Sequence, residues 1–164
     1  MARLRGMRAS GRPDLFAFRE FSAACMEEAL RSPSYADGRK ERLRALAEDL
    51  GRRVRGVLSP DDVELAGLVT RLYAIIGIDV EGTVPGALTF RRCYFSARYT
   101  PALCAFMSAF DDGFISGLCG GGRLMFDSRI TEGNPGCEAC FEKRCEGKGA
   151  DPALEGFGNG GGAS

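Results

Sequence analysis

A long apolar segment between Thr100-Pro101 and Gly120-Gly121-Gly122 most constrains how this 164-residue chain can fold. Threonine followed by proline is typical of a helix start, because the hydroxyl caps a free amide and proline fits the first helical position. Apolar residues then follow the spacing of one helix face: Leu103, Phe106, Met107, Phe110, Phe114 and Leu118. A face this apolar has to be buried, so the pattern predicts a helix at the centre of the fold.

Strand-like segments flank this helix on both sides. Residues 78–82 and 87–90 surround a proline–glycine turn, which predicts a hairpin. Residues 124–130 and 137–143 predict two further strands. Strict alternation along the second strand puts two sets of side chains on opposite faces, namely Leu88, Phe90, Arg92 and Tyr94 against Thr89, Arg91, Cys93 and Phe95.

Three amphipathic helices are predicted before residue 78. The first begins near Pro13 and ends at Pro33, and the third begins at Ser59-Pro60 and ends near Gly77. The second is capped by Asp37. Its predicted buried face consists of Leu43, Leu46, Ala47, Leu50, Val54 and Leu58.

This order of elements predicts the α+β class, with an N-terminal helical layer packed on a small, mostly antiparallel sheet and one long central helix. The length suits a single domain over residues 13–146, in which residues 13–77 form the helical part and residues 78–146 carry the sheet and central helix. Residues 1–12 predict a disordered basic start, and residues 147–164 predict a disordered glycine-rich tail.

The charge balance argues against several classes of partner. Lysine plus arginine equals aspartate plus glutamate at 22 each, so no net field favours nucleic acid or an anionic membrane. No run reaches the roughly 18 apolar residues of a membrane span. The basic start lacks the apolar stretch that follows it in a signal peptide. We therefore expect a cytoplasmic protein without nucleic-acid or membrane partners, while the oligomeric state stays open.

Seven cysteines and no histidine limit the chemistry. Without histidine, neither a Ser-His-Asp nor a Cys-His triad can form within this chain. Cys137 and Cys140 form a C-x-x-C pair, but a closed zinc site needs four ligands, and strand alternation puts the two on opposite faces. We therefore expect neither a metal ion nor another cofactor.

Cys104 and Asp111 are the candidate catalytic residues. Cys104 lies just past the first turn of the predicted central helix, where free amide groups would lower the pKa of a thiol and favour the thiolate. Asp111 returns to the same face two turns later, with Ser108 between them. This face borders the buried one, so it could line a pocket against the sheet. The alternative interpretation is a small buried thiol and an unrelated surface acid.

A set of residues occurs in order between positions 92 and 137: Arg92-Cys93, Leu103-Cys104, Asp111, Gly117-Leu118, Leu124, Phe126, Arg129, Glu132-Gly133 and Cys137. This order resembles the L-2-amino-thiazoline-4-carboxylic acid hydrolase family. The chain departs from the family at Tyr94, where the family has proline, and at Ala139, where the family has an aromatic residue. The resemblance implies hydrolytic opening of a cyclic amidine, a small-molecule substrate, to a carbamoyl-cysteine.

The resemblance to this hydrolase family and the chemistry of the residues lead to one hypothesis for the reaction. The Cys104 thiolate attacks the amidine carbon, and Asp111 serves as general acid and base. Cys93 and Cys137 line the pocket, and Arg129 holds the substrate carboxylate. Two other functions stay open: a cysteine-based metal- or small-ligand-binding module without catalytic activity, and a partner-binding domain whose cysteines belong to the core.

Overall fold

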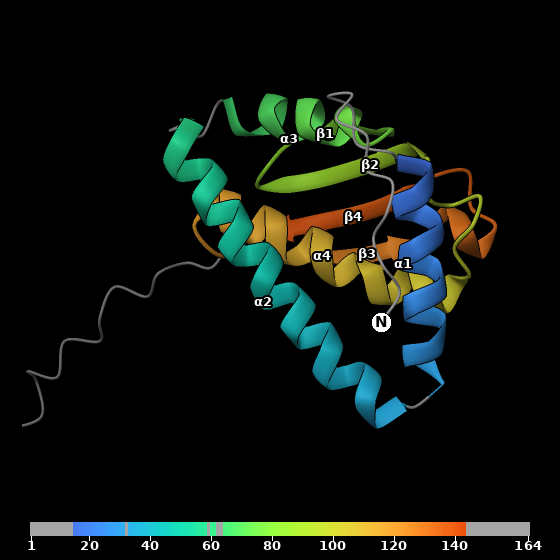
Figure 1. Cartoon of the computed structure of the whole chain (residues 1–164). Coiled ribbons are helices and arrows are strands. Elements are labelled where there is room, and N and C mark those ends of the chain that lie inside the picture. The colour runs from blue at the N-terminus through green and yellow to red at the C-terminus, as the bar shows by residue number, and fades with distance from the viewer. Residues whose placement is uncertain (1–14, 32, 59, 62–63, 144–164) are drawn as a thin grey trace, which may run out of the picture.

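The computed structural model describes residues 15–31, 33–58, 60–61 and 64–143. The predicted disordered segments, residues 1–12 and 147–164, lie outside these ranges. The described chain forms, in order, α1 (Leu15–Leu30), α2 (Pro33–Leu58), α3 (Glu64–Ile75), β1 (Ile78–Gly82), β2 (Gly86–Cys93), α4 (Pro101–Cys119), β3 (Arg123–Ser128), the short 3₁₀ helix η1 (Ile130–Glu132) and β4 (Cys137–Glu142) (Figure 1).

The four strands form one sheet in the order β1-β2-β4-β3. All three neighbouring pairs are antiparallel. β4, the last strand in the described chain, therefore lies in the middle of the sheet, where it pairs with β2 on one side and β3 on the other. Helices followed by this antiparallel sheet confirm the predicted α+β class.

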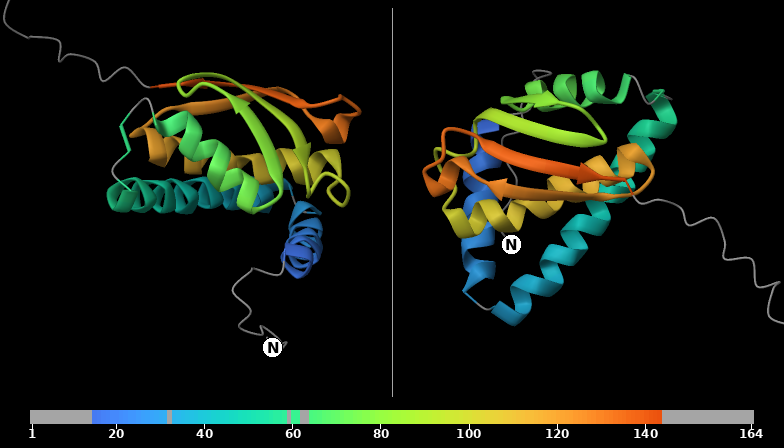
Figure 2. Two further views of the ribbon diagram at one scale, coloured as in Figure 1. Left: turned by 90° about the horizontal axis from the view of Figure 1, so that it is seen from above. Right: turned by 180° about the vertical axis from the view of Figure 1, so that it is seen from behind.

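The helices cover one face of the sheet in successive layers. Figure 2 shows the sheet on one side, α3 and α4 against it, and α2 beyond α4. The face away from the helices carries polar pairs, among them Thr89 with Glu138 at 2.8 Å and Arg91 with Glu81 at 2.9 Å. Apolar side chains of the strands are thus buried against α3 and α4, where they form one continuous core.

The central helix α4 agrees with its prediction at both ends. The Thr100 hydroxyl accepts a hydrogen bond from the Leu103 amide at 3.2 Å, and Pro101 takes the first helical position. Gly120 ends the helix with a positive φ of 78°, a left-handed conformation that glycine adopts without strain. By length and composition alone α4 could cross a membrane, and 61% of its apolar 18-residue window is buried in the fold.

The starts of α2 and α3 differ from their predictions. α2 begins at Pro33 rather than after Asp37, because proline fits the first turn of a helix as well as it ends the preceding one. α3 begins at Glu64, whose amide donates to Asp61 Oδ1 at 2.8 Å. Asp61 therefore caps α3 in the described chain, while Ser59 lies outside the described residues.

The buried face of α2 also differs from the prediction. Leu46 is 62% exposed, and Leu50 and Leu58 are also exposed, whereas Ala47 and Gly51 are buried. α2 packs on α4 through small residues, which let the two backbones approach closely. The leucine stripe therefore faces away from α4, a choice that helical spacing alone could not make.

Candidate functional site

Three cysteines and one aspartate from different elements meet between the sheet and α4. Cys93 ends β2, Cys137 begins β4, and Cys104 and Asp111 lie on α4. Cys137 is buried, and the other three are partly buried.

Cys93 reaches this interior because the hairpin contains a β-bulge. The pairing of β1 with β2 skips Arg91, so that Cys93 lies opposite Ile78. The extra residue reverses the alternation beyond it, and Cys93 shares the inner face with Phe90. The prediction that these two side chains lie on opposite faces was wrong, because strict alternation cannot anticipate an inserted residue.

The ionisable groups of this neighbourhood influence one another. Burial raises the pKa of Cys93 to about 11; backbone hydrogen bonds lower it, and the charges of Asp111 and Cys104 raise it further. Burial likewise raises the pKa of Cys137, with contributions from the charges of the same two groups. Because charges shift a pKa only over short distances, the four side chains lie in one region of the interior.

Asp111 is held as a largely desolvated carboxyl group. Burial raises its pKa from 3.8 to about 7, while a hydrogen bond and the charge of Arg129 act in the opposite direction. The hydrogen bond comes from the Tyr73 hydroxyl, which donates to Asp111 Oδ1 at 2.8 Å. A carboxyl group that is about half ionised near neutral pH can both accept and donate a proton.

Cys104 differs from its prediction in its acidity. Burial raises the pKa of its thiol, and this effect exceeds the lowering by the Thr131 hydroxyl and the Arg129 guanidinium. Its own amide already bonds to the Thr100 carbonyl at 2.9 Å, so it is not one of the free amides at the helix start. The expectation of a lowered pKa was wrong, and the thiol needs a proton acceptor before or during attack.

Two polar groups lie beside the thiols. The buried Thr131 hydroxyl interacts with the Cys104 thiol and lowers its pKa. The Ile130 amide donates to Cys137 Sγ at 3.3 Å, a weak interaction with a poor acceptor.

Arg129 lies at the boundary of this site. Its Nε donates to Ser108 Oγ at 3.5 Å, its Nη1 contacts Glu132 at 3.4 Å, and its guanidinium stacks over Phe126 at 5.1 Å from the ring centroid. Both polar contacts are long, so the guanidinium keeps hydrogen-bonding capacity for a ligand. Its charge acts on Cys104, Asp111 and Cys137 at the same time.

The state of Asp111 predicts an unusual pH dependence of stability. With a folded pKa near 7 against an ordinary value of 3.8, its contribution is full below about pH 4 and is lost as the pH rises through 7. We expect Asp111→Asn to match the wild type near pH 4 and to exceed its free energy of unfolding by about 4 kcal/mol at pH 8. Urea denaturation of both proteins across this range measures the difference. A difference that stays constant with pH would contradict the assignment.

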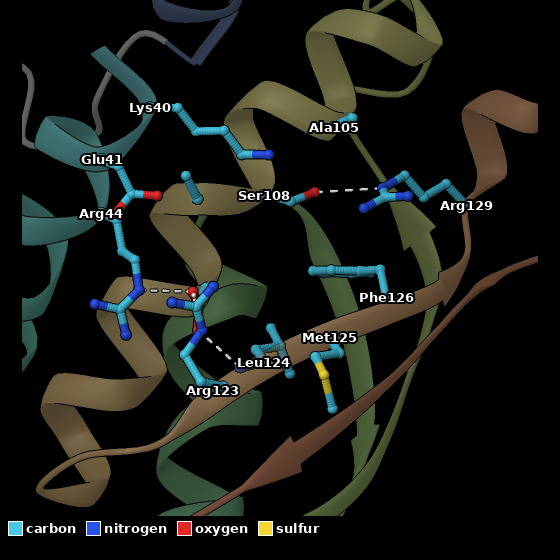
Figure 3. A pocket seen from close by; sticks show the side chains of 12 residues that line it. Lys40, Glu41, Arg44, Ala105, Ser108, Arg123, Leu124, Met125, Phe126 and Arg129 are labelled. Carbon is cyan, nitrogen blue, oxygen red and sulfur yellow. Dashed lines mark hydrogen bonds and ion pairs between the residues drawn. The ribbon is translucent and has the colours of Figure 1, made fainter. Parts of the chain in front are cut away.

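A cleft of about 200 Å³ lies on the neighbouring face of α4, between α2 and β3 (Figure 3). Ser108 and Arg129 line it, but none of the three thiols and not Asp111. The two faces of α4 are adjacent, with Ser108 between them. The cleft and the thiol–carboxyl site are therefore neighbours that share Arg129.

Asp112, next to Asp111 in sequence, organises this second face. It is 5% exposed, its Oδ2 contacts Arg44 Nε at 2.7 Å and Arg123 Nε at 3.3 Å, and its Oδ1 accepts from the Leu124 amide at 2.8 Å. One carboxylate thus connects α2, α4 and β3. In the sequence it was only one of two adjacent acids, and no local signal marks it as buried.

Metal binding finds no support in the described part of the chain. No group of three or more cysteine, aspartate or glutamate side chains is arranged to hold an ion there. Cys137 is buried on the inner face of β4, and Cys140 is three residues further along the strand, on the opposite face. Cys145 lies outside the described residues.

Comparisons with protein-family models and with curated proteins found no match to this chain. The geometry of the site and the order of its residues therefore carry the functional argument.

Proposed function

We propose that this chain is a small hydrolase that opens a cyclic amidine or cyclic amide, with a 2-amino-thiazoline-4-carboxylate-like substrate. One observation carries the proposal: Cys104 and two further thiols share a neighbourhood with Asp111, whose pKa of about 7 suits a general acid and base. The resemblance to the L-2-amino-thiazoline-4-carboxylic acid hydrolase family supplies the class of substrate.

The spacing of Cys104 and Asp111 suits a small ring between them. Seven residues of helix correspond to a rise of about 10 Å, which is too far for direct proton transfer between the two side chains. A five-membered ring placed between them would present its amidine carbon to the thiol and its ring heteroatom to the carboxyl group. The thiol proton would then pass to the amidine nitrogen, and the Asp111 proton would pass to the ring heteroatom.

In the first step, the Cys104 sulfur forms a bond to the amidine carbon, and the thiol proton passes to the amidine nitrogen. The bond between this carbon and the ring heteroatom then breaks, and protonated Asp111 gives its proton to the heteroatom. Water attacks the resulting enzyme-bound isothiouronium carbon, and Asp111 takes one water proton. The carbon–sulfur bond breaks as the remaining hydroxyl proton returns to Cys104. One water is consumed, and both residues regain their starting states.

Arg129 is proposed to bind the substrate carboxylate. Its long contacts to Ser108 and Glu132 leave donors for a charge-assisted, bidentate hydrogen bond. Cys93 and Cys137 would line the site around the ring as uncharged thiols, in accordance with their raised pKa values. No described group supplies a metal centre, and the proposed chemistry does not use one.

A ring-opening assay with 2-amino-thiazoline-4-carboxylate tests the proposal. We expect Cys104→Ser to lower kcat by about 10³-fold or more and Asp111→Asn to lower it by about 10²- to 10⁴-fold. Cys140→Ser is the matched control, because Cys140 lies on the other face of the sheet and should leave kcat unchanged. Absence of turnover by the wild type, or full activity of folded Cys104→Ser, would refute the proposal.

A second candidate, a small-ligand-binding module without catalysis, is favoured by a specific observation. The pKa values of all three clustered thiols are raised by burial, which makes them poor nucleophiles near neutral pH. This candidate predicts that the ring compound binds but is recovered unchanged. The same assay, run with a binding measurement, therefore separates the two functions.

A reducing compartment suits both candidates, and we propose a cytoplasmic location. Cys93, Cys104, Cys137 and Cys140 are free thiols. Oxidising compartments favour disulfides in cysteine-rich chains of this size. The proposed partner is the small-molecule substrate alone.

A further inference from the structure

The cleft between α2, α4 and β3 has an unusual charge. Its lining contains four cationic side chains, Lys40, Arg44, Arg123 and Arg129, against two acidic ones, Glu41 and Asp112. The chain as a whole carries no net charge, so this excess of positive charge is local. A concave site with low-dielectric walls concentrates such a field and attracts anions.

The cations of the cleft differ in how far they are already paired. Arg44 is fully engaged, because it contacts Asp112 at 2.7 Å, Glu48 at 2.9 Å and the Gly122 carbonyl at 3.3 Å. Lys40, by contrast, forms no ion pair or hydrogen bond with another residue of the described chain, and its side chain is exposed. Lys40 and Arg129 point toward Ser108 from opposite sides of the cleft (Figure 3).

Arg123 and Arg129 also keep free donors. Arg123 uses its Nε for a 3.3 Å contact with Asp112, and its side chain is 54% exposed. Within the described part of the chain, the Arg129 side chain makes two polar contacts, both of them long. A guanidinium has five N–H donors, so both terminal groups can turn toward a ligand in the cleft.

We propose that this cleft is a binding site for a small oxyanion, a phosphate or carboxylate group of a soluble ligand, held by Lys40, Arg123 and Arg129. The cleft volume of about 200 Å³ admits such a group together with a small organic body. Phe126 provides an apolar wall for that body. Planar and tetrahedral oxyanions both match the donor geometry of arginine.

The two acids of the cleft affect this site unequally. The charge of Asp112 is compensated by Arg44 and Arg123, and its Oδ1 is occupied by the Leu124 amide. Glu41 lies on exposed α2 surface beside Lys40 and has no such compensation among the described contacts. Glu41 therefore weakens anion binding, and its neutralisation should tighten it.

The inference goes beyond the proposed hydrolase, because the cleft is lined by neither the thiols nor Asp111. Arg129 is common to both sites, so a bound oxyanion and the proposed substrate carboxylate would exclude each other. Binding of the oxyanion can be measured without any ring substrate. It should persist in Cys104→Ser, so that the two proposals can fail separately.

Titration with inorganic phosphate and, separately, with acetate tests the site. Chloride keeps the ionic strength constant, and the amide NMR signals of Leu124 and Met125 report on the cleft. We expect a saturable shift with at least one of the two anions. Lys40→Met should weaken binding about tenfold, as expected for loss of one charge-assisted contact, and Glu41→Gln should tighten it.

Arg53→Met is the matched control. It removes one positive charge from the same helix, at a side chain that is 77% exposed and outside the cleft. It should leave the affinity unchanged. The proposal is overturned if neither anion saturates, or if Lys40→Met weakens binding no more than Arg53→Met. Saturation with phosphate alone assigns a phosphate group, and saturation with acetate alone assigns a carboxylate.

Discussion

Gly113→Ala is expected to lower the free energy of unfolding by about 3 kcal/mol or more. A Cβ atom at Gly113 would lie 2.1 Å from the Arg44 carbonyl oxygen and 3.1 Å from the Ala47 Cβ. The oxygen belongs to the backbone of α2, so it cannot move aside without separating the two helices. This cost outweighs the roughly 1 kcal/mol by which alanine favours a helix over glycine. Urea denaturation followed by circular dichroism measures the change.

Gly56→Ala is the matched control on the partner helix. No atom lies within 4 Å of a Cβ at Gly56, so alanine should raise the free energy of unfolding by about 0.5–1 kcal/mol through helix propensity alone. Opposite signs for the two substitutions would establish a backbone contact between the helices. Equal and small effects would show instead that α2 and α4 are not in close contact.

Glycines on both helices allow the close contact between α2 and α4. A Cβ at Gly117 would lie 2.1 Å from the Glu48 carbonyl oxygen, and one at Gly51 would lie 2.2 Å from the Phe114 carbonyl oxygen. Three glycines thus set the distance between α2 and α4. That distance carries Lys40 and Arg44 on α2 to the cleft beside α4. The glycines therefore position a candidate binding site as well as stabilising the fold.

Asp112→Ala is expected to destabilise the protein by about 3 kcal/mol, at the lower end of the cost of breaking a buried ion pair. The substitution removes the partner of Arg44 at 2.7 Å and leaves the Leu124 amide without its acceptor. Arg44 retains Glu48 at 2.9 Å, which limits the cost. The free energy of unfolding, measured in urea at constant salt, gives the difference.

Two further substitutions test this account of Asp112. Asp112→Asn keeps an acceptor for the Leu124 amide and should recover part of the loss. Asp49→Ala removes an acid on α2 that is 45% exposed and paired with Arg53, and should cost less than about 1 kcal/mol. If Asp112→Ala and Asp49→Ala cost the same, the buried carboxylate does not connect α2, α4 and β3 as described.

Several features were predictable because their signals are local. The Thr100 hydroxyl caps the start of α4, and the Pro101 ring fits its first position. Three glycines follow the end of this helix. The hairpin of β1 and β2 depends on a turn between two short apolar runs. The order of these elements was sufficient for the α+β class.

Other features had no local signal. On α2, the leucines and the small residues both recur at helical spacing, so either face could be the buried one. Packing against α4 decides that the small residues are buried. The bulge that turns Cys93 inward depends on the register between two strands. The high pKa of Cys104 depends on what covers it, which outweighs its position near a helix start.

By itself the sequence determined the elements, their order and the residues available for chemistry, because caps, turns and periodicity act over a few neighbouring positions. The tertiary structure alone decided the two roles of adjacent acids: Asp111 faces Tyr73 and the thiols, while Asp112 binds two arginines on the next face of the same helix. Charge state and burial depend on groups that are distant along the chain and meet only when it is folded. The proposed activity depends on the position of Asp111 beside the thiols, and the proposed anion site depends on the position of Asp112 beside the arginines.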